Sequence, residues 1–340
     1  MRCGVMVAAA MLSVVGITAC TAERLPPAAM DQAPGSAQTR AAMTIQSNAV
    51  AVGMQRPAGT EPGYTAYEAA KTQLLPLLAH GSPRQRLAAL LMQPDFSNDG
   101  WNQALVALLL EDGGRDPLLA GQALNACAQW KDCPREQVLA LTAQLAGEDA
   151  RLQLLRLAIS EPDAHEGLWE AAAQATAYVD PVRLQWAAWL EVTEPLATTA
   201  AQDHRRVVEG LSVAHAVAMP DLNTMKNRCP AASQVNDRVL QCRQLALLMA
   251  ESSNMLTASV GLLFLRRQAL SPAEAEPWNQ LYRQLSWQAQ LAAPLMDAEA
   301  GYPRQMARLG ERAAIAWLLR QHGLPLSPPP HWQPGQPTGY

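Results

Sequence analysis

Apolar and polar positions alternate along the middle of the chain in runs about one helix long. Three of these runs cover residues 101–110, 150–159 and 167–178. Alanine and leucine are abundant, whereas consecutive β-branched residues are rare. Because alanine and leucine are strong helix formers, the pattern predicts consecutive helices of about 12 to 15 residues joined by short links.

Helix-start signals recur between these runs. In "SPRQ" at residues 82–85 and "SPAE" at 271–274, the serine suits the cap, the proline suits the first turn, and the fourth residue completes a capping box. Related signals begin at Asp116, Cys133 and Asp180. The first start and the three related ones are 34, 17 and 47 residues apart. A spacing of 17 residues fits one helix with a short turn, and 34 residues fit two.

The 34-residue spacing resembles that of tetratricopeptide and Sel1-like repeats. The tetratricopeptide pattern requires Trp, Leu-Gly, Tyr, Ala and Pro at fixed places, and only fragments such as "WNQLY" at residues 278–282 are similar to it, without the glycine. An irregular α-solenoid and a compact helical-hairpin bundle would both give this pattern. We therefore expect an all-α fold in which each hairpin buries its apolar face by stacking on its neighbours.

The beginning of the chain carries a different apolar pattern. Residues 3–19 contain no charged side chain and follow Arg2, which is the layout of a secretory signal peptide. Their end runs into Cys20 as "ITAC", residues 17–20, which resembles the lipobox of bacterial lipoproteins. The resemblance implies that the Cys20 thiol receives a diacylglycerol, that cleavage follows Ala19, and that the new amine is acylated. Several acyl chains would then hold the protein on the membrane.

The alternative for this segment is a plain signal peptide with an incidental cysteine. In lipoproteins the residue after the cysteine directs sorting, and Thr21 is not an aspartate. The resemblance therefore implies an outer-membrane lipoprotein that faces the periplasm.

Composition divides the chain into a signal peptide (1–19), a flexible tether (20–63), a helical domain (64–326) and a proline-rich tail (327–340). The tether holds several prolines and no lasting apolar periodicity, so it cannot bury enough surface to offset its ordering entropy. The tail is expected to be extended or polyproline-like. Such segments can be ligands for aromatic grooves, although most of them are simply chain ends.

Four cysteines follow the lipobox, and an even number in an exported chain favours disulfides. Four cysteines allow three pairings, among which local spacing favours Cys127–Cys133 and Cys229–Cys242. The first link would staple a helical hairpin across its turn, and the second would pin a loop to the helix that it leads into. The alternative, a zinc site of four cysteines, lacks the usual C-x₂-C spacing, and we expect no metal site.

Tryptophan is unusually frequent, with nine residues against two phenylalanines. In such a chain most tryptophans are expected to fill the interior. Trp186 and Trp189 are three positions apart on one helix face, and Arg183 lies near them. Because aromatic residues and arginine dominate interface hot spots, these three residues are the candidates for a partner-binding surface.

Charge and motif content exclude several classes of function. The net charge of -4 gives no basic field to attract nucleic acid. The chain contains no H-E-x-x-H, no glycine-rich phosphate loop and no C-x-x-C. The segment "GLSVA" at residues 210–214 comes near the G-x-S-x-G nucleophile elbow, but that motif requires a strand-to-helix turn, and the local spacing is helical. We expect no catalytic residue and no cofactor.

These observations favour a non-catalytic envelope lipoprotein that acts as a protein-interaction or scaffold module. It would contact the membrane through its lipid and an envelope protein through its helical domain. One alternative is an inhibitor or immunity protein against a toxic envelope hydrolase. A second alternative is an envelope enzyme whose site is assembled from scattered residues.

Overall fold

The computed structural model describes residues 62–92, 99–197, 199–215, 222–296, 299 and 301–336. Within these residues the chain forms α-helices, short 3₁₀ helices and one isolated bridge between Asp149 and Ala177. The predicted all-α fold is confirmed. The predicted signal peptide and Cys20 lie outside the described residues, as does nearly all of the predicted tether.

The helices follow one another with short connections. In chain order they are α2 (Pro62–Ala79), α3 (Pro83–Leu91), α4 (Asp99–Asp112), α5 (Pro117–Gln129), α6 (Arg135–Ala146), α7 (Ala150–Leu157), α8 (His165–Gln174), α9 (Pro181–Val192), α10 (Ala200–His215), α11 (Leu222–Arg228), α12 (Asp237–Glu251), α13 (Met255–Gln268), α14 (Pro272–Met296), α15 (Tyr302–Leu309) and α16 (Glu311–Gln321), with 3₁₀ helices η2 (Pro162–Ala164) and η3 (Glu194–Leu196) between them.

Local capping chemistry explains most of the predicted helix starts. Ser82 caps α3 and forms a capping box with Gln85, and Pro83 takes the first turn. Asp116 caps α5 and Asp180 caps α9, each accepting backbone N–H groups of the first turn. These side chains satisfy donors that a helix leaves unpaired at its N-terminus.

Two of the predicted starts differ in detail. The backbone of Pro134 takes the cap position of α6, without a side-chain cap, so the helix begins two residues after Cys133. Before α14 the Ser271 hydroxyl accepts from the backbone N–H of Glu274, whose own carboxylate accepts from the backbone of Leu270 rather than from the cap residue.

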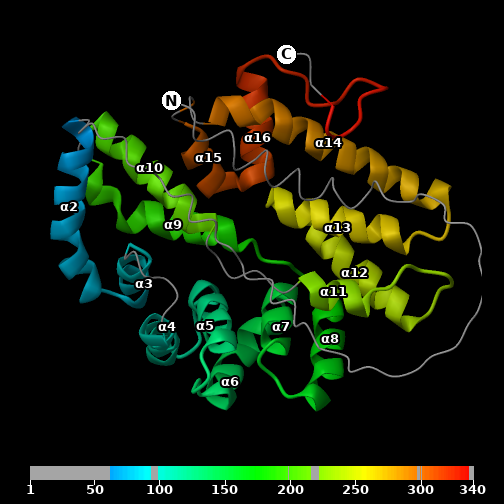
Figure 1. Ribbon diagram of the computed structural model, residues 1–340, viewed down its shortest axis with the longest axis horizontal. Helices are drawn as coiled ribbons and strands as arrows, with labels where there is room; N and C mark the ends of the chain where they lie inside the picture. The colour runs from blue at the N-terminus through cyan, green and yellow to red at the C-terminus, as the bar shows by residue number, and fades with distance from the viewer. Residues whose placement is uncertain are drawn as a thin grey trace, which may run out of the picture.

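The helices pack first as sequential hairpins, namely α4 with α5, α7 with α8, α9 with α10, α12 with α13 and α15 with α16. Contacts also join distant parts of the chain, because α10 packs on α2, α12 on α8 and α15 on α9. In Figure 1, α9 crosses the middle of the molecule, between the row α5–α8 and the group α13–α16. The chain thus folds back on itself, and repeat-like stacking in one direction is not confirmed.

The interior consists of three apolar clusters. The first core joins α2–α7 with α9, the second joins α9 with α12–α16, and the third joins α7, α8, α11 and α12. Helix α9 serves two of them, because Trp189 packs in the first core and Trp186 in the second. This helix therefore holds the two halves of the molecule together.

Both predicted disulfides are present. Cys127 near the end of α5 is bonded to Cys133, and Cys229 directly after α11 is bonded to Cys242 in α12. The first link closes the turn between α5 and α6. The second fastens the end of α11 to α12. Cys127, Cys229 and Cys242 are buried, and Cys133 is half-buried.

The described part of the proline-rich tail packs on the helical domain. Residues 324–336, which we call the tail, leave α16 and lie against α14, as the red segment in Figure 1 shows. Trp332 is part of the second core with 6% of its surface exposed. Residues 327–336, beyond the boundary predicted at residue 326, therefore pack on the helices that precede it.

Candidate functional site

The predicted partner surface at Trp186 and Trp189 is wrong. Trp186 is 0% exposed and Trp189 is 2% exposed. The Trp189 indole N–H donates to the backbone carbonyl of Arg206, 3.0 Å away, and its ring contacts Gly210, where a Cβ would lie 2.3 Å from the ring. Arg183 is half-buried beside them. Because α9 is covered on two sides, these tryptophans hold the fold and are not available to a partner.

The most deeply buried charged groups lie where α5, α7 and the segment before α9 meet. Arg151 is 1% exposed, and its Nε lies 3.8 Å from a carboxylate oxygen of Asp149. Its guanidinium also donates to the Pro117 carbonyl, 3.3 Å away. Gly121 leaves the space for it, since a Cβ there would lie 2.5 Å from the guanidinium.

Burial dominates the electrostatics of this cluster. Desolvation raises the pKa of Asp149 and lowers the pKa of Arg151, because it disfavours both charged forms. Asp149 also caps α7 and accepts from the backbone of Val179. The Tyr178 hydroxyl is buried without a hydrogen-bond partner in the described part of the chain. These contacts join three segments of backbone, which is a structural role.

A surface depression of about 610 Å³ lies between the start of α3 and the end of α9. It is lined by Ser82, Arg84, Gln85, Glu191, Val192, Glu194 and Pro195. The α3 side chains in its wall already have partners, because Ser82 and Gln85 form the capping box and Arg84 pairs with Asp116. This depression is therefore built around a helix cap rather than around a free constellation of reactive groups.

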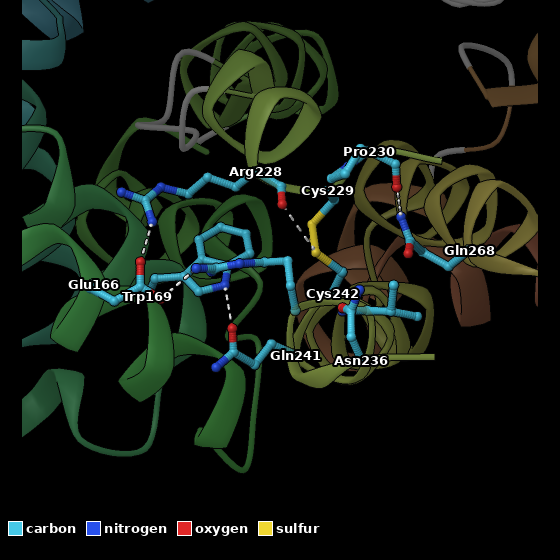
Figure 2. Close-up of a disulfide and its surroundings, with 11 residues drawn as sticks. Glu166, Trp169, Arg228, Cys229, Pro230, Asn236, Gln241, Cys242 and Gln268 are labelled. Atoms are coloured by element: carbon cyan, nitrogen blue, oxygen red, sulfur yellow. Dashed lines mark hydrogen bonds and ion pairs between the residues drawn. A yellow bond between two sulfur atoms is a disulfide. The ribbon is translucent and has the colours of Figure 1, made fainter. Parts of the chain in front are cut away.

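The surroundings of the second disulfide form a rigid corner of the surface (Figure 2). Glu166 of α8 pairs with Arg228 and Arg238, and both guanidinium groups lie over the ring of Trp169, at 5.5 and 5.6 Å from its centre. The Trp169 indole N–H donates to Gln241, 3.1 Å away. Hydrogen bonds from these two arginines lower the pKa of Glu166. The arrangement fixes α8 to α11 and α12.

The loop after Cys229 is held from the other side as well. Gln268 at the end of α13 donates to the Pro230 carbonyl, 2.7 Å away, as Figure 2 shows. Val235 and Leu240 are 55% and 51% exposed, and they occupy the positions before and after the Asn236 cap that form a hydrophobic staple in other helices.

Helix α14 binds the tail through hydrogen bonds from its side chains. Four of its side chains donate to backbone carbonyls of the tail, and we call them the α14 face: Arg283, Trp287, Gln288 and Gln290. Their acceptors are spread along the whole tail: the carbonyls of Pro325, Leu326, Pro329, Pro330, Trp332 and Gln336.

Arg283 is the centre of this contact. Its Nε donates to the Trp332 carbonyl, 3.0 Å away, and its Nη2 donates to the carbonyls of Pro329 and Pro330, at 3.2 and 2.9 Å. A guanidinium offers five N–H donors in a fixed planar fork. One side chain of α14 can therefore hold several carbonyls of a turn that has few internal hydrogen bonds.

Trp332 is the apolar anchor of the tail. Its ring meets that of Trp287 edge to face, with 5.2 Å between the ring centres. Burying a tryptophan removes about 200 Å² from water, which stabilises by at most about 5 kcal/mol. The Trp332 indole N–H donates to Gln336, 3.2 Å away, which curls the end of the tail around the ring.

The sequence contained part of the signal for this site. The tail was expected to be extended, and its proline-rich composition fits aromatic grooves in other proteins. The partner residues Arg283 and Trp287 lie about 40 positions earlier, inside an ordinary amphipathic helix. Nothing in the local pattern connects these two stretches.

Three further observations on the described residues concern the chemistry considered from the sequence. Residues 210–214 lie within α10, so "GLSVA" is helical and is not a strand-to-helix turn. Among the described residues, no cluster of three or more His, Cys, Asp or Glu is arranged to hold a metal ion. No helix in the described ranges is both long enough and apolar enough to span a membrane.

Comparison of the chain with models of protein families, with curated proteins and with solved structures found no match in any of the three.

Proposed function

We propose that the chain is an envelope lipoprotein, anchored through Cys20 in the outer membrane, whose helical domain acts as a non-catalytic protein-interaction or scaffold module. One observation carries the interaction part of this proposal. The α14 face holds a non-helical segment by donating to its backbone carbonyls and by packing its tryptophan. This is the chemistry by which many domains recognise peptides.

The paired state of the buried charges also supports a structural and binding role. Arg206 pairs with Asp203 and is 4% exposed, and Glu209 of α10 accepts from Tyr67 and Lys71 of α2. General acid–base catalysis needs titratable groups that point at a substrate. These groups instead bond to one another and join helices.

The anchor is tested by labelling. Wild-type chain expressed with a labelled fatty acid should carry the label at an N-terminal Cys20, and Cys20→Ala should carry none. Mass spectrometry of the mature N-terminus provides the readout. A mature N-terminus at another residue would refute the lipoprotein part of the proposal.

The interaction is tested by photo-crosslinking in the intact envelope. A crosslinker at Leu281, 42% exposed and two turns before Gln288 on α14, should give a discrete adduct with an envelope protein. The matched control is Leu77 on α2, 71% exposed at the other end of the molecule, which should give none. Equal adduct patterns at both positions, or none at either, would contradict the proposed interaction.

A further inference from the structure

We infer that the α14 face is a binding site for a non-helical, proline-rich segment that carries a tryptophan, supplied by an envelope protein, and that the chain's own tail occupies this site until such a segment displaces it. The inference rests on the proposed interaction function and names its ligand class and its regulation. Residues 328–332, "PPPHW", are the part of the tail that defines this ligand.

The polar contacts recognise conformation rather than sequence. Each donor of the α14 face bonds a backbone carbonyl, and every residue of any peptide has one. What the face requires is a chain whose carbonyls can accept a side-chain donor, and two of them, those of Pro329 and Gln336, also accept from Trp332 within the tail. Proline-rich segments meet this requirement because proline has no backbone N–H, so fewer of their carbonyls are paired within the segment.

The apolar contact supplies the selectivity. Trp332 is the one buried residue among residues 327–336, whereas its neighbours His331 and Gln333 are exposed. A tryptophan that inserts its ring beside a second aromatic ring is a common hot spot of binding interfaces. A foreign segment therefore needs a tryptophan after its prolines, and the residues around it can vary.

The tail has the properties of a displaceable occupant. It leaves α16 at Gly323, whose φ of +65° lets the backbone turn sharply. Apart from Trp332 its residues are half-buried or exposed. Segments with few buried contacts open locally without unfolding the rest of a protein, so the tail can leave while the helices stay packed.

Attachment makes the tail a strong competitor. A ligand on a short tether has an effective concentration on the order of 1 mM. A free peptide of the same sequence must compete with the docked tail. Its affinity for the wild-type chain is therefore lower than its affinity for a chain whose tail cannot dock, and the ratio of the two affinities measures the competition. We expect this factor to be about tenfold or more.

The test uses the full lipidated chain in detergent and a fluorescent peptide with the sequence of residues 327–336, titrated by anisotropy. Trp332→Ala in the chain should empty the site and increase the affinity for the peptide about tenfold or more over wild type. Circular dichroism of the variant should retain its helical signal. Failure of the peptide to bind a folded Trp332→Ala chain would overturn the inference.

Two sets of controls test the ligand class. In the peptide, replacement of the tryptophan by alanine should abolish binding, and replacement of Pro328, Pro329 and Pro330 by alanine should weaken it several-fold. In the Trp332→Ala chain, Arg283→Ala should weaken peptide binding about tenfold or more, because three carbonyls lose their donor. The exposed Arg308 on α15 is the matched control, and Arg308→Ala should leave binding unchanged.

A second approach serves if Trp332→Ala does not fold. The peptide, with benzophenone in place of His331, is irradiated at millimolar concentration with the wild-type chain. The adducts should map to α14, and adducts scattered over other helices would overturn the inference.

The oligomeric state separates a foreign ligand from a second copy. Light scattering should give the mass of a monomer for the wild-type chain, which means that the tail binds within its own molecule. A wild-type dimer that Trp332→Ala dissociates would mean that the site takes the tail of a second copy, which overturns the inference. If the peptide does not bind but Leu281 gives a specific adduct, the proposed interaction stands and only this inference fails. If the peptide binds but Leu281 gives no adduct, only the proposed interaction fails.

Discussion

The first and second cores are covered at their outer ends in different ways. The first core ends with α2, a complete helix, which Glu209 of α10 holds through Tyr67 and Lys71. The second core ends with the tail, which is not helical and brings Trp332 into the apolar cluster. Leucine and alanine make up most of the first core, while the second also contains Trp186, Trp287, Trp332 and Tyr302.

The two covering segments, α2 and the tail, differ in which groups satisfy their backbone N–H and C=O groups. A helix such as α2 satisfies its own backbone groups, so a few side-chain contacts are enough to fix it. The tail satisfies only a few of its backbone groups through its own turns, and the helix beneath it supplies further donors. Arg283, Gln288 and Gln290 are those donors. The helix beneath a non-helical covering segment thus carries side-chain donors that bind the backbone of that segment.

The largest effect is expected where one helix serves both cores. Trp189→Ala should destabilise the first core and Trp186→Ala the second, each by about 3–5 kcal/mol, because a buried aromatic ring is lost and a cavity remains. Equilibrium urea unfolding measures both. A loss below about 1 kcal/mol for either variant would mean that its ring is not packed in the core.

The two disulfides should differ with the length of the loop that each closes. They join residues separated by 13 positions for Cys229–Cys242 and by 6 for Cys127–Cys133. In the chain-entropy model, removal of the longer link costs about 3 kcal/mol and removal of the shorter about 2.4 kcal/mol. Double serine variants of each pair, compared by urea unfolding, test this order. A greater cost for the shorter link would show that local packing outweighs loop length.

The two covering segments offer a matched pair of smaller changes. Tyr67→Phe removes the hydrogen bond that α2 donates to Glu209, and we expect a loss of about 1 kcal/mol, shared by the whole first core. Arg283→Met removes the central donors of the α14 face, and its effect should be confined to the tail. Thermal unfolding should therefore respond to Tyr67→Phe more than to Arg283→Met, and the reverse order would contradict this comparison.

The smallest effect is expected at Glu166, whose side chain is 53% exposed. Hydrogen bonds from Arg238 and Arg228 lower its pKa in the folded chain. Its contribution to stability is therefore present above the unfolded pKa, near 4.5, and is lost as the pH falls through the lower folded value. Glu166→Gln should lower the melting temperature at pH 7 by about 2 °C or less. The difference from wild type should vanish at low pH, and a difference that persists there would exclude this ionic origin.

Features with local causes could be predicted from the sequence. The caps at Ser82, Asp116 and Asp180 act within three residues of themselves, so their motifs fix the helix starts. The disulfide pairing of Cys127 with Cys133 also depended on a short separation and a turn between two helices.

Features that depend on what covers a helix could not be predicted in this way. The spacing of Trp186 and Trp189 placed both rings on one face of the helix, but it contained no information about the two cores that cover α9. The tail was predicted as extended or polyproline-like, whereas residues 330–331 and 334–335 form turns. Its docking depends on Arg283 and Trp287, which are remote in sequence. Tertiary contacts decide both outcomes, and a local pattern does not encode them.

Native-state hydrogen exchange over a series of urea concentrations tests most directly whether the tail is a separable occupant of the α14 face. The Trp332 and Gln336 amides are hydrogen-bonded to Pro329 and Gln333 when the tail is docked, at 3.1 Å each. They should exchange through a local opening with a low free energy and little dependence on urea, while the amides of α16 exchange only on global unfolding. Equal free energies and equal urea dependence for the tail and α16 would contradict the account, because the tail would then unfold only together with the core.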